Sequence, residues 1–398
     1  MEGQLFAAIS HTERGIHMTV HTVRAGDTVY KIAGQHGVTP QALAKANGLA
    51  NPDRIIVGQS LVIPAIPRPG QGLRRPEIIV NGYCYPTIRD EALAGALPHL
   101  TFLSVFACSV GGDGSLTPME NDGRAIARAK AAGVRPHMVI ANLEEGKGFQ
   151  PQVVQSLLEN PAAQVRLLDS CVKLMREKGY TGLDIDFEYV PTDVRENLGG
   201  FLAKARAWMH DEGFLLTSAV PAKNSDDQGG PLFGGFDFWA QGKYNDFVTL
   251  MTYEWGYQGG EPQAVAPIGE VRRSVEYALS RIPKDKILMG IPNYGYDWKI
   301  PWQKGTNATV VQNPGAVSVA ARYGANIDFD EKARTPWFRY TEPGGQRREV
   351  WFEDARSIQS KLELVRELGI AGVSYWTVNN PFAANWTLLE GMFRIKKI

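Results

Sequence analysis

Three acidic residues alternate with apolar ones in the stretch GLDIDFEYV at 182–190. In a β-strand, Asp184, Asp186 and Glu188 would share one face, about 7 Å from one to the next, and the apolar residues would share the other. A row of neighbouring carboxylates is costly to bury because its members cannot all ionise cheaply, and a carboxyl that keeps its proton can act as a general acid. An antiparallel strand with its acidic face in water would show the same pattern, so the environment of this strand must be found from the rest of the chain.

Continuous apolar runs, separated by stretches with helical periodicity, recur through the second part of the chain. The runs lie at 78–83, 102–107, 137–142, 182–189, 215–220, 247–253, 287–291 and 372–376. Such runs indicate strands that are buried on both faces, as in a parallel sheet, and eight β–α alternations predict a closed (β/α)8 TIM barrel. The acidic face of the fourth strand then points into the barrel. Glu188 lies nearest the carboxyl end of that strand, where the active sites of such barrels lie.

The segment between the seventh and eighth strands is too long for a single helix. It contains a helical pattern at 316–323 and a hairpin pattern in which two β-rich runs, 337–342 and 348–352, flank Pro343-Gly344-Gly345. We therefore predict a small α+β insertion at about 300–354 that walls one side of a cleft. The barrel domain as a whole is predicted over residues 77–398.

A smaller domain is predicted over residues 19–64. Its order is strand, helix, helix, strand, with Asp27 or Thr28 capping the first helix and Thr39 the second. Residues 65–76 are rich in Pro and Gly and predict a semi-extended tether. Residues 1–18 have little pattern and lack the features of a secretory signal, and we expect an unstructured or start-site extension with Met18 as the true start.

Composition excludes several classes of function. Basic and acidic residues balance at 42 each, so net charge favours neither nucleic acid nor an anionic membrane. The three cysteines, too few for a disulfide framework, are expected to be inert buried thiols. Apolar runs are shorter than a transmembrane span, and the histidines are scattered. We therefore expect no metal, no cofactor, no nucleic acid and no membrane partner.

The first domain resembles the LysM module. The resemblance rests on Gly26-Asp27-Thr28, the Asn-Gly pair at 47–48, Val57-Gly58-Gln59 and the closing Ile63-Pro64. It implies binding of glycans that contain N-acetylglucosamine, such as peptidoglycan or chitin. The implied groove is formed by Gly26, Asp27, Thr28, Leu49, Asn51, Asp53 and Ile55, although helix capping alone would also explain Asp27 and Thr28.

The second domain resembles glycoside hydrolase family 18. Residues 181–188, TGLDIDFE, match the family's acidic signature with Thr181 in place of its first Asp, and we expect Thr181 to be the most deeply buried position of a shortened acidic row. The Met-Thr-Tyr-Glu run at 251–254 matches a second motif with Glu254 in place of Asp, and Trp376 matches the family's floor tryptophan. Longer stretches are similar to spore-germination glycosidases, which cleave spore cortex peptidoglycan and lack a secretory signal.

The resemblance implies a retaining mechanism in which the 2-acetamido group of the substrate attacks the anomeric carbon. Glu188 would be the acid/base, Asp186 would orient the acetamido nitrogen, Asp184 would share a proton with Asp186, and Tyr253 would hold the acetamido oxygen. Trp376 would form the apolar floor, although core packing would also explain Tyr253 and Trp376. The further candidates for substrate contact are Glu254, Asn142, Tyr294 and Asp297.

The sequence leaves alternatives for the function. A chitinase or chitooligosaccharide hydrolase would have the same motifs, and a non-catalytic glycan-binding spore-coat protein is a rival of another class. We expect a monomeric enzyme of the spore coat or cortex region, or otherwise of the cell wall, that acts on peptidoglycan or another N-acetylglucosamine polymer.

Overall fold

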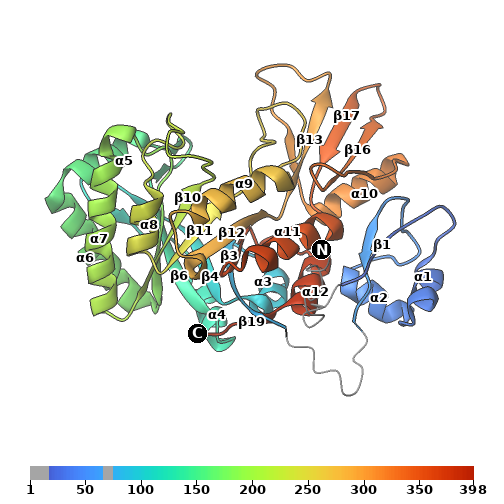
Figure 1. Ribbon diagram of the computed structural model, residues 1–398, viewed down its shortest axis with the longest axis horizontal. Helices are drawn as coiled ribbons and strands as arrows, with labels where there is room; N and C mark the ends of the chain where they lie inside the picture. Colours follow the sequence, from blue (N-terminus) through green and yellow to red (C-terminus); the bar gives the residue numbers. More distant parts are fainter. Residues whose placement is uncertain (1–17, 66–74) are drawn as a thin grey trace, which may run out of the picture.

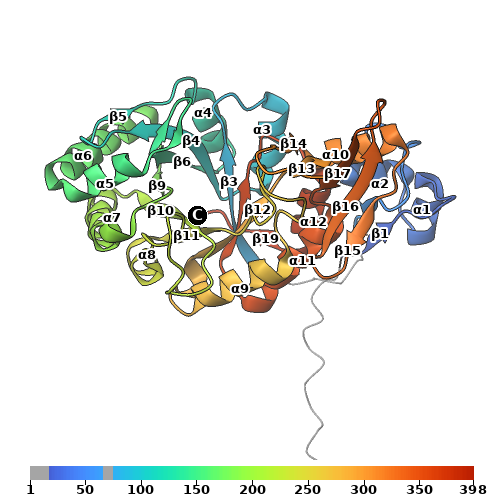
Figure 2. The ribbon, with the colours of Figure 1, turned by 90° about the horizontal axis from the view of Figure 1, so that it is seen from above.

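The computed structural model describes residues 18–65 and 75–398 (Figure 1). The expectations for residues 1–17 and for most of the 65–76 tether lie outside the described residues. In the described part, the chain forms a small N-terminal module, a barrel and an insertion that rises from one end of the barrel (Figures 1 and 2). Among these residues, no helix is long and apolar enough to cross a membrane.

The N-terminal module has the predicted βααβ order. Its elements are β1 (Val20–Thr22), α1 (Val29–His36), α2 (Pro40–Asn47) and β2 (Ser60–Val62), and β1 pairs with β2 in antiparallel register. Thr28 caps α1 by accepting the Lys31 N–H, and Thr39 caps α2 in the same way. The helices pack their apolar faces around Ile32 and Leu43, which are fully buried, so these few residues form a core of their own.

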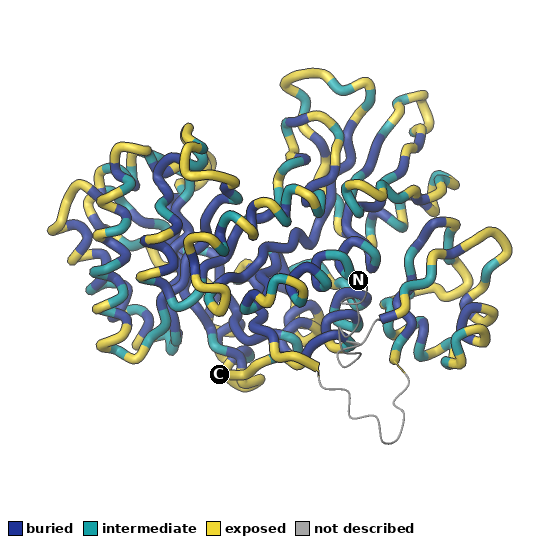
Figure 3. The backbone as a smooth tube through the Cα atoms, in the orientation of Figure 1, coloured by how far each residue is buried: buried dark blue, intermediate teal, exposed yellow. Residues whose placement is uncertain are grey.

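Eight parallel strands close into the predicted barrel, because β3 pairs with both β4 and β18. The barrel strands are β3 (Glu77–Cys84), β4 (Phe102–Val110), β6 (Arg135–Ala141), β9 (Gly182–Asp186), β10 (Leu215–Pro221), β11 (Phe247–Met251), β12 (Ile287–Pro292) and β18 (Gly372–Trp376). Short strands at its edges are β5 (Leu116–Thr117), β7 (Leu143–Glu144), β8 (Gly148–Phe149) and β19 (Arg394–Ile395). Figure 3 shows the barrel strands as the most deeply buried part of the molecule.

Helices surround the barrel. They are α3 (Asp90–Ala96), α4 (Gly123–Ala131), α5 (Pro151–Glu159), α6 (Pro161–Lys178), α7 (Arg195–Asp211), α8 (Phe238–Tyr244), α9 (Ile268–Leu279), α11 (Ala355–Leu368) and α12 (Ala383–Met392), with 3-10 turns η1 (Leu97–His99), η2 (Thr192–Val194) and η3 (Lys284–Lys286). The apolar face of β9 packs under them, and the ring of Phe187 stacks on Phe201 of α7 with 6.1 Å between centroids. This packing leaves the acidic face of β9 for the barrel interior.

The insertion between β12 and β18 is a sheet backed by one helix. It contains β13 (Gly295–Ile300), β14 (Thr309–Val311), α10 (Asn313–Tyr323), β15 (Asp328–Asp330), β16 (Thr335–Thr341) and β17 (Arg347–Trp351), and its antiparallel strand order is β14-β13-β17-β16-β15. The predicted hairpin corresponds to β16 and β17. The insertion begins at β13, a few residues before 300, because 295–300 pair in antiparallel register with β17 instead of continuing the barrel.

Candidate active site

Asp184 occupies the centre of the barrel. Its carboxylate accepts hydrogen bonds from the Tyr83 hydroxyl at 2.6 Å and the Thr217 hydroxyl at 2.5 Å. Burial raises the pKa of Asp184, whereas these two hydrogen bonds lower it. Burial is the larger effect, so the pKa of Asp184 remains above its ordinary value, while the two donors fix the position of its carboxyl group.

Asp186 lies one step further toward the carboxyl end of β9. The residue is buried, and its Oδ1 has no hydrogen-bond partner among the described residues. Burial raises the pKa of Asp186 well above its ordinary value, and the neighbouring carboxylates of Glu188 and Asp184 raise it further. Asp186 therefore has a free oxygen that a polar group of a ligand can satisfy.

Glu188 follows β9 at the mouth of the barrel. Burial, with a smaller contribution from the Glu254 carboxylate, raises the pKa of Glu188 to about 7. Its backbone is held by Asn142, whose Oδ1 accepts the Glu188 N–H at 2.9 Å and whose Nδ2 donates to the Glu188 carbonyl at 3.0 Å. Asn142 is itself buried, so the structure places it behind the acid as a support for the Glu188 peptide.

Tyr253 comes directly after β11 and lies beside the acidic row. Burial raises the pKa of Tyr253 well above its ordinary value, and the carboxylates of Asp186 and Glu188 raise it further because they lie close to the phenol. The residue is partly buried, and no hydrogen bond joins its hydroxyl to another residue in the described part of the chain. A Cβ on Gly290 would come within 2.8 Å of the Tyr253 ring, so this glycine lets the ring lie against β12.

Glu254 has a left-handed backbone with φ 71°, which turns it away from the direction of β11. Its carboxylate accepts hydrogen bonds from the hydroxyls of Tyr294 and Tyr296. The residue has solvent access, yet the enclosing side chains desolvate the carboxylate and raise its pKa, while the two tyrosines lower it. Tyr294 and Tyr296 are thus brought to the site through Glu254.

Trp376 is the last residue of β18, and its indole lies among aromatic side chains at that end of the barrel. Its ring meets Phe106 edge-on at 4.9 Å between centroids, and it also packs against Tyr83 at 5.5 Å and Tyr85 at 6.1 Å. Asn293 holds the following chain, because its N–H donates to the Trp376 carbonyl and its Nδ2 to the Thr377 carbonyl. The indole is therefore fixed among aromatic rings, as an apolar platform requires.

Two sequence-based expectations about positions are corrected. Thr181 is neither the deepest residue nor a member of the acidic row. It is partly exposed, and because side chains alternate along a strand, it faces the side opposite to Asp184, where its hydroxyl donates to the Pro136 carbonyl. Asp297 lies in β13 of the insertion instead of ending a barrel strand, and its carboxylate accepts a hydrogen bond from Tyr340 at 2.7 Å.

Sequence reasoning missed several residues of the site: Tyr83, Thr217, Phe106 and Tyr296. Tyr83 lies on β3, 101 positions before Asp184, whereas Thr217 lies on β10, the next barrel strand after β9. Tyr83 is the last residue of a predicted strand and Thr217 is the third residue of another, and polar residues at both kinds of position are common in strands without a catalytic role.

The predicted groove of the N-terminal module is only partly free. Asp27 accepts hydrogen bonds from the His21 ring and the Arg24 N–H, and Thr28 is occupied by helix capping. Asn51 accepts the Asp53 N–H through its Oδ1. The loop at 49–53 is exposed apart from Leu49, which is partly buried, and Ile55 is partly buried as well.

Within 18–65 and 75–398, the part that the structure describes, no group of side chains is arranged to hold a metal ion. The three cysteines are buried free thiols, and burial raises the pKa of Cys84 to about 12 and of Cys108 to about 11. The chemistry available at the site is therefore that of carboxyl groups, phenols and an indole.

Comparison with known proteins gives the family of each domain. Residues 106–380 match the family described as glycosyl hydrolases family 18, and residues 21–64 match the LysM domain. The chain is 35% identical to the cortical fragment-lytic enzyme of Bacillus subtilis, with 96% of this chain and 99% of the relative covered.

Solved structures give the same result. The spore cortex-lytic enzyme SleL of Bacillus cereus superposes with a TM-score of 0.90 at 33% identity, covering 96% of this chain and 99% of SleL. A chitinase of Chromobacterium violaceum superposes with a TM-score of 0.73 at 25% identity, covering 79% of this chain and 98% of the chitinase. The chain belongs to glycosyl hydrolases family 18, a family of glycosidases, and carries an N-terminal LysM domain.

Proposed function

We propose that the chain hydrolyses β-1,4 bonds next to N-acetylglucosamine in peptidoglycan of the spore cortex, by a retaining mechanism in which the substrate's acetamido group takes part. The observation that carries this proposal is the row of Asp184, Asp186 and Glu188, with the phenol of Tyr253 beside it. The similarity to the two spore cortex-lytic enzymes supports the choice of substrate.

Glu188 is the general acid in this mechanism. With a pKa of about 7, its carboxyl group is about half protonated at neutral pH and can give its proton to the departing glycosidic oxygen. An ordinary glutamate would be almost fully ionised at that pH. Burial at the barrel mouth therefore supplies the acid that the reaction needs.

Asp186 and Tyr253 serve the acetamido group. As the bond to the leaving oxygen breaks, the acetamido oxygen bonds to the anomeric carbon and forms a positively charged oxazolinium ring. The unpartnered Oδ1 of Asp186 accepts the acetamido N–H, and the Tyr253 hydroxyl donates to the acetamido oxygen. Asp184 shares a proton with Asp186, and the hydroxyls of Tyr83 and Thr217 hold its carboxyl group in place inside the barrel.

Water completes the reaction. Glu188, now a carboxylate, takes a proton from a water molecule that attacks the anomeric carbon, and the acetamido group is released unchanged. Two displacements at one carbon give net retention. Trp376 supports the apolar face of the sugar during both steps, and Glu254 with Tyr294 binds polar groups at the rim of the site.

The LysM domain holds the enzyme on its polymer in this proposal, and the active form is a monomer associated with the spore. Because the module occurs once in the described chain, it adds binding without the avidity that repeated modules would give.

The test is the substitution Glu188→Gln, assayed on purified cortex fragments with product masses read by mass spectrometry. We expect the rate to fall by several orders of magnitude while binding to insoluble peptidoglycan persists. Glu261→Gln, which changes an exposed glutamate in the loop after β11, is the matched control and should keep full activity. An active Glu188→Gln variant would refute the assignment of the acid.

A chitinase is the second candidate, because the Chromobacterium violaceum chitinase shares the fold. Parallel digestion of cortex fragments and colloidal chitin distinguishes the two, since the proposal requires faster release of products from cortex. Release of reducing ends by the wild-type protein also excludes a purely glycan-binding role.

A further inference from the structure

The LysM domain is fixed on the rest of the chain rather than loosely tethered. The Ile327 N–H donates to the Val57 carbonyl at 3.1 Å, and the Thr387 hydroxyl donates to the Ala46 carbonyl at 2.7 Å. A Cβ on Gly58 would lie 1.8 Å from the Ile327 carbonyl oxygen, so the two backbones touch there. These contacts hold a surface of the LysM domain against the insertion.

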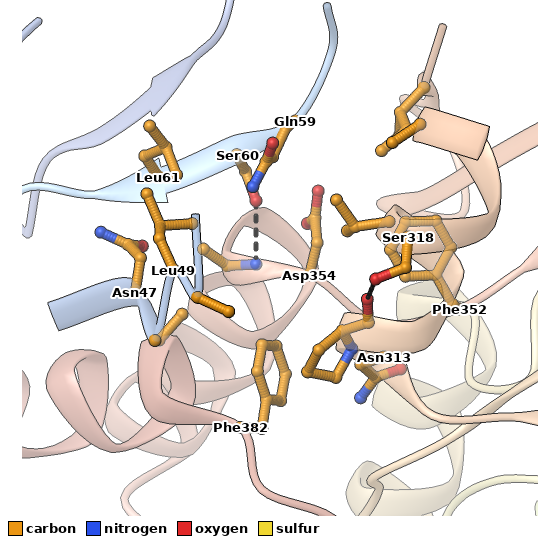
Figure 4. Close-up of a pocket in the computed structure, with 18 of the residues that line it drawn as sticks. Asn47, Leu49, Gln59, Ser60, Leu61, Asn313, Ser318, Phe352, Asp354 and Phe382 are labelled. Carbon is orange, nitrogen blue, oxygen red and sulfur yellow. Dashed lines mark hydrogen bonds between the residues drawn. The ribbon is translucent and has the colours of Figure 1, made fainter. Parts of the chain in front are cut away.

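A pocket of about 630 Å³ lies between these surfaces (Figure 4). Leu49 and Ser60 of the LysM domain face Asn313 and Ser318 of the insertion across it, and Phe382 forms one end. Its volume lies within the range of small-molecule sites, which is ~300–1,000 Å³. Asp184, Asp186 and Glu188 do not line it, and of the predicted LysM groove it includes only Leu49 and Asn51.

Negative charge in the pocket wall is already compensated. Glu353 pairs with the buried Lys361, with Nζ–O distances of 3.0 and 2.8 Å. Asp354 pairs with Arg356 at 2.7 Å and caps α11. Neither carboxylate is therefore free to repel an anion or to neutralise further positive charge.

Two positive charges that line the pocket are not compensated. Arg54 of the LysM domain and Arg322 of α10 line the pocket, both are exposed, and neither has an ion pair or a side-chain hydrogen bond within the described residues. Two amides add further donors. Asn51 and Gln59 each accept a backbone N–H through the side-chain oxygen, which leaves their NH₂ groups without a partner in the described part of the chain.

We propose that this pocket binds a carboxylate-bearing fragment of a peptidoglycan strand, with Arg54 and Arg322 on the carboxylate and Phe382 against a sugar ring. The lining offers donors and an apolar face but no free acid, which favours an anionic, acceptor-rich ligand over an uncharged one. The proposal rests on the proposed function, because it takes peptidoglycan as the polymer. It adds a second site that distinguishes acidic muramyl groups from plain N-acetylglucosamine.

The test measures binding to the full chain carrying Glu188→Gln, so that no ligand is consumed. The probe is the disaccharide of N-acetylglucosamine and N-acetylmuramic acid, and the comparison ligands are its methyl ester and N,N′-diacetylchitobiose. Titration calorimetry is carried out with the double variant Arg54→Ala/Arg322→Ala. Arg24→Ala/Arg347→Ala is the matched control, since it removes two exposed arginines that do not line the pocket.

We expect the acid to bind at least tenfold more weakly to the Arg54/Arg322 variant and unchanged to the control. The affinities of the methyl ester and of diacetylchitobiose should change little in either double variant. Ser318→Trp, which fills the pocket, should also weaken binding of the acid. Equal affinity of the acid for the Glu188→Gln chain with and without the Arg54→Ala/Arg322→Ala change, or an ester that binds as well as the acid, would overturn the proposal.

The proposed function is measured separately, as hydrolysis of cortex fragments by the chain with Glu188 intact. If arginine-dependent binding is found without hydrolysis, the pocket stands and the proposed activity fails. If hydrolysis is found and the binding of the acid is independent of both arginines, the activity stands and the pocket proposal fails.

Discussion

Replacing Glu254 with Gln should lower the pKa of the catalytic acid. The pKa of Glu188 rises from 4.5 to about 7, with burial as the larger cause and the Glu254 charge as the smaller. Glu254 therefore accounts for less than half of this rise, so its share is about 1 pKa unit at most. Gln keeps the shape of the side chain and can still accept hydrogen bonds from Tyr294 and Tyr296 through its carbonyl oxygen.

The expected effect on the rate follows from the protonated fraction of Glu188. A pKa of about 6 would leave about a tenth of the acid protonated at pH 7, compared with about half for a pKa of about 7. The alkaline limb of kcat/KM should therefore move to lower pH. The ratio of kcat/KM at pH 7 to kcat/KM at pH 5 should be about fivefold lower in the variant than in the unsubstituted enzyme.

The assay is the pH profile of kcat/KM on soluble cortex fragments between pH 4 and 9. Any contact that Glu254 makes with substrate would lower the whole profile equally, so the position of the alkaline limb separates the charge effect from lost binding. Glu261→Gln, an exposed change in the same loop, should leave the limb in place. An alkaline limb of the Glu254→Gln variant that stays fixed or moves to higher pH would refute the reasoning.

Two further predictions concern residues that support the site. Asn142→Ala removes both hydrogen bonds to the Glu188 backbone, so we expect kcat to fall about 10- to 100-fold with little change in KM. Asn160→Ala, which removes the cap of α6, is the control and should lower stability without lowering kcat. If Asn142 had a purely structural role, Asn142→Ala would also lower stability and leave kcat unchanged. Gly58→Ala should reduce the free energy of unfolding, measured with urea, by about 1–3 kcal/mol more than Gly26→Ala, because both have positive φ but only Gly58 meets a neighbouring backbone.

The barrel could be predicted because its strands are buried on both faces and therefore have long apolar runs. The alternation of acids in β9 then fixes which side chains point inward, whatever the detailed register. The same alternation should have excluded Thr181 from the acidic row, since odd-numbered residues of this strand face the helices. Position in the motif places Thr181 beside the acids, but the alternation of side chains along the strand places it on the opposite face.

Partners of the acids could not be predicted because they depend on the register between strands and on contacts across the barrel. Tyr83 reaches Asp184 from a strand that is not its neighbour in the sheet. Asn142 reaches Glu188 because Ala141 pairs with Asp186, which brings the ends of β6 and β9 together. Neither relation leaves a pattern in the sequence around the residue itself.

The substitution of Glu for Asp at position 254 is explained by the insertion. With φ 71° the backbone directs this side chain toward the start of the insertion, where Tyr294, just before β13, and Tyr296, in β13, donate their hydroxyls to a single carboxylate. An aspartate would be one methylene shorter, and its oxygens would lie correspondingly further from the two phenols. Glu254, Tyr294 and Tyr296 thus form one unit that joins the end of β11 to the insertion and places its negative charge close enough to Glu188 to raise the pKa of the acid.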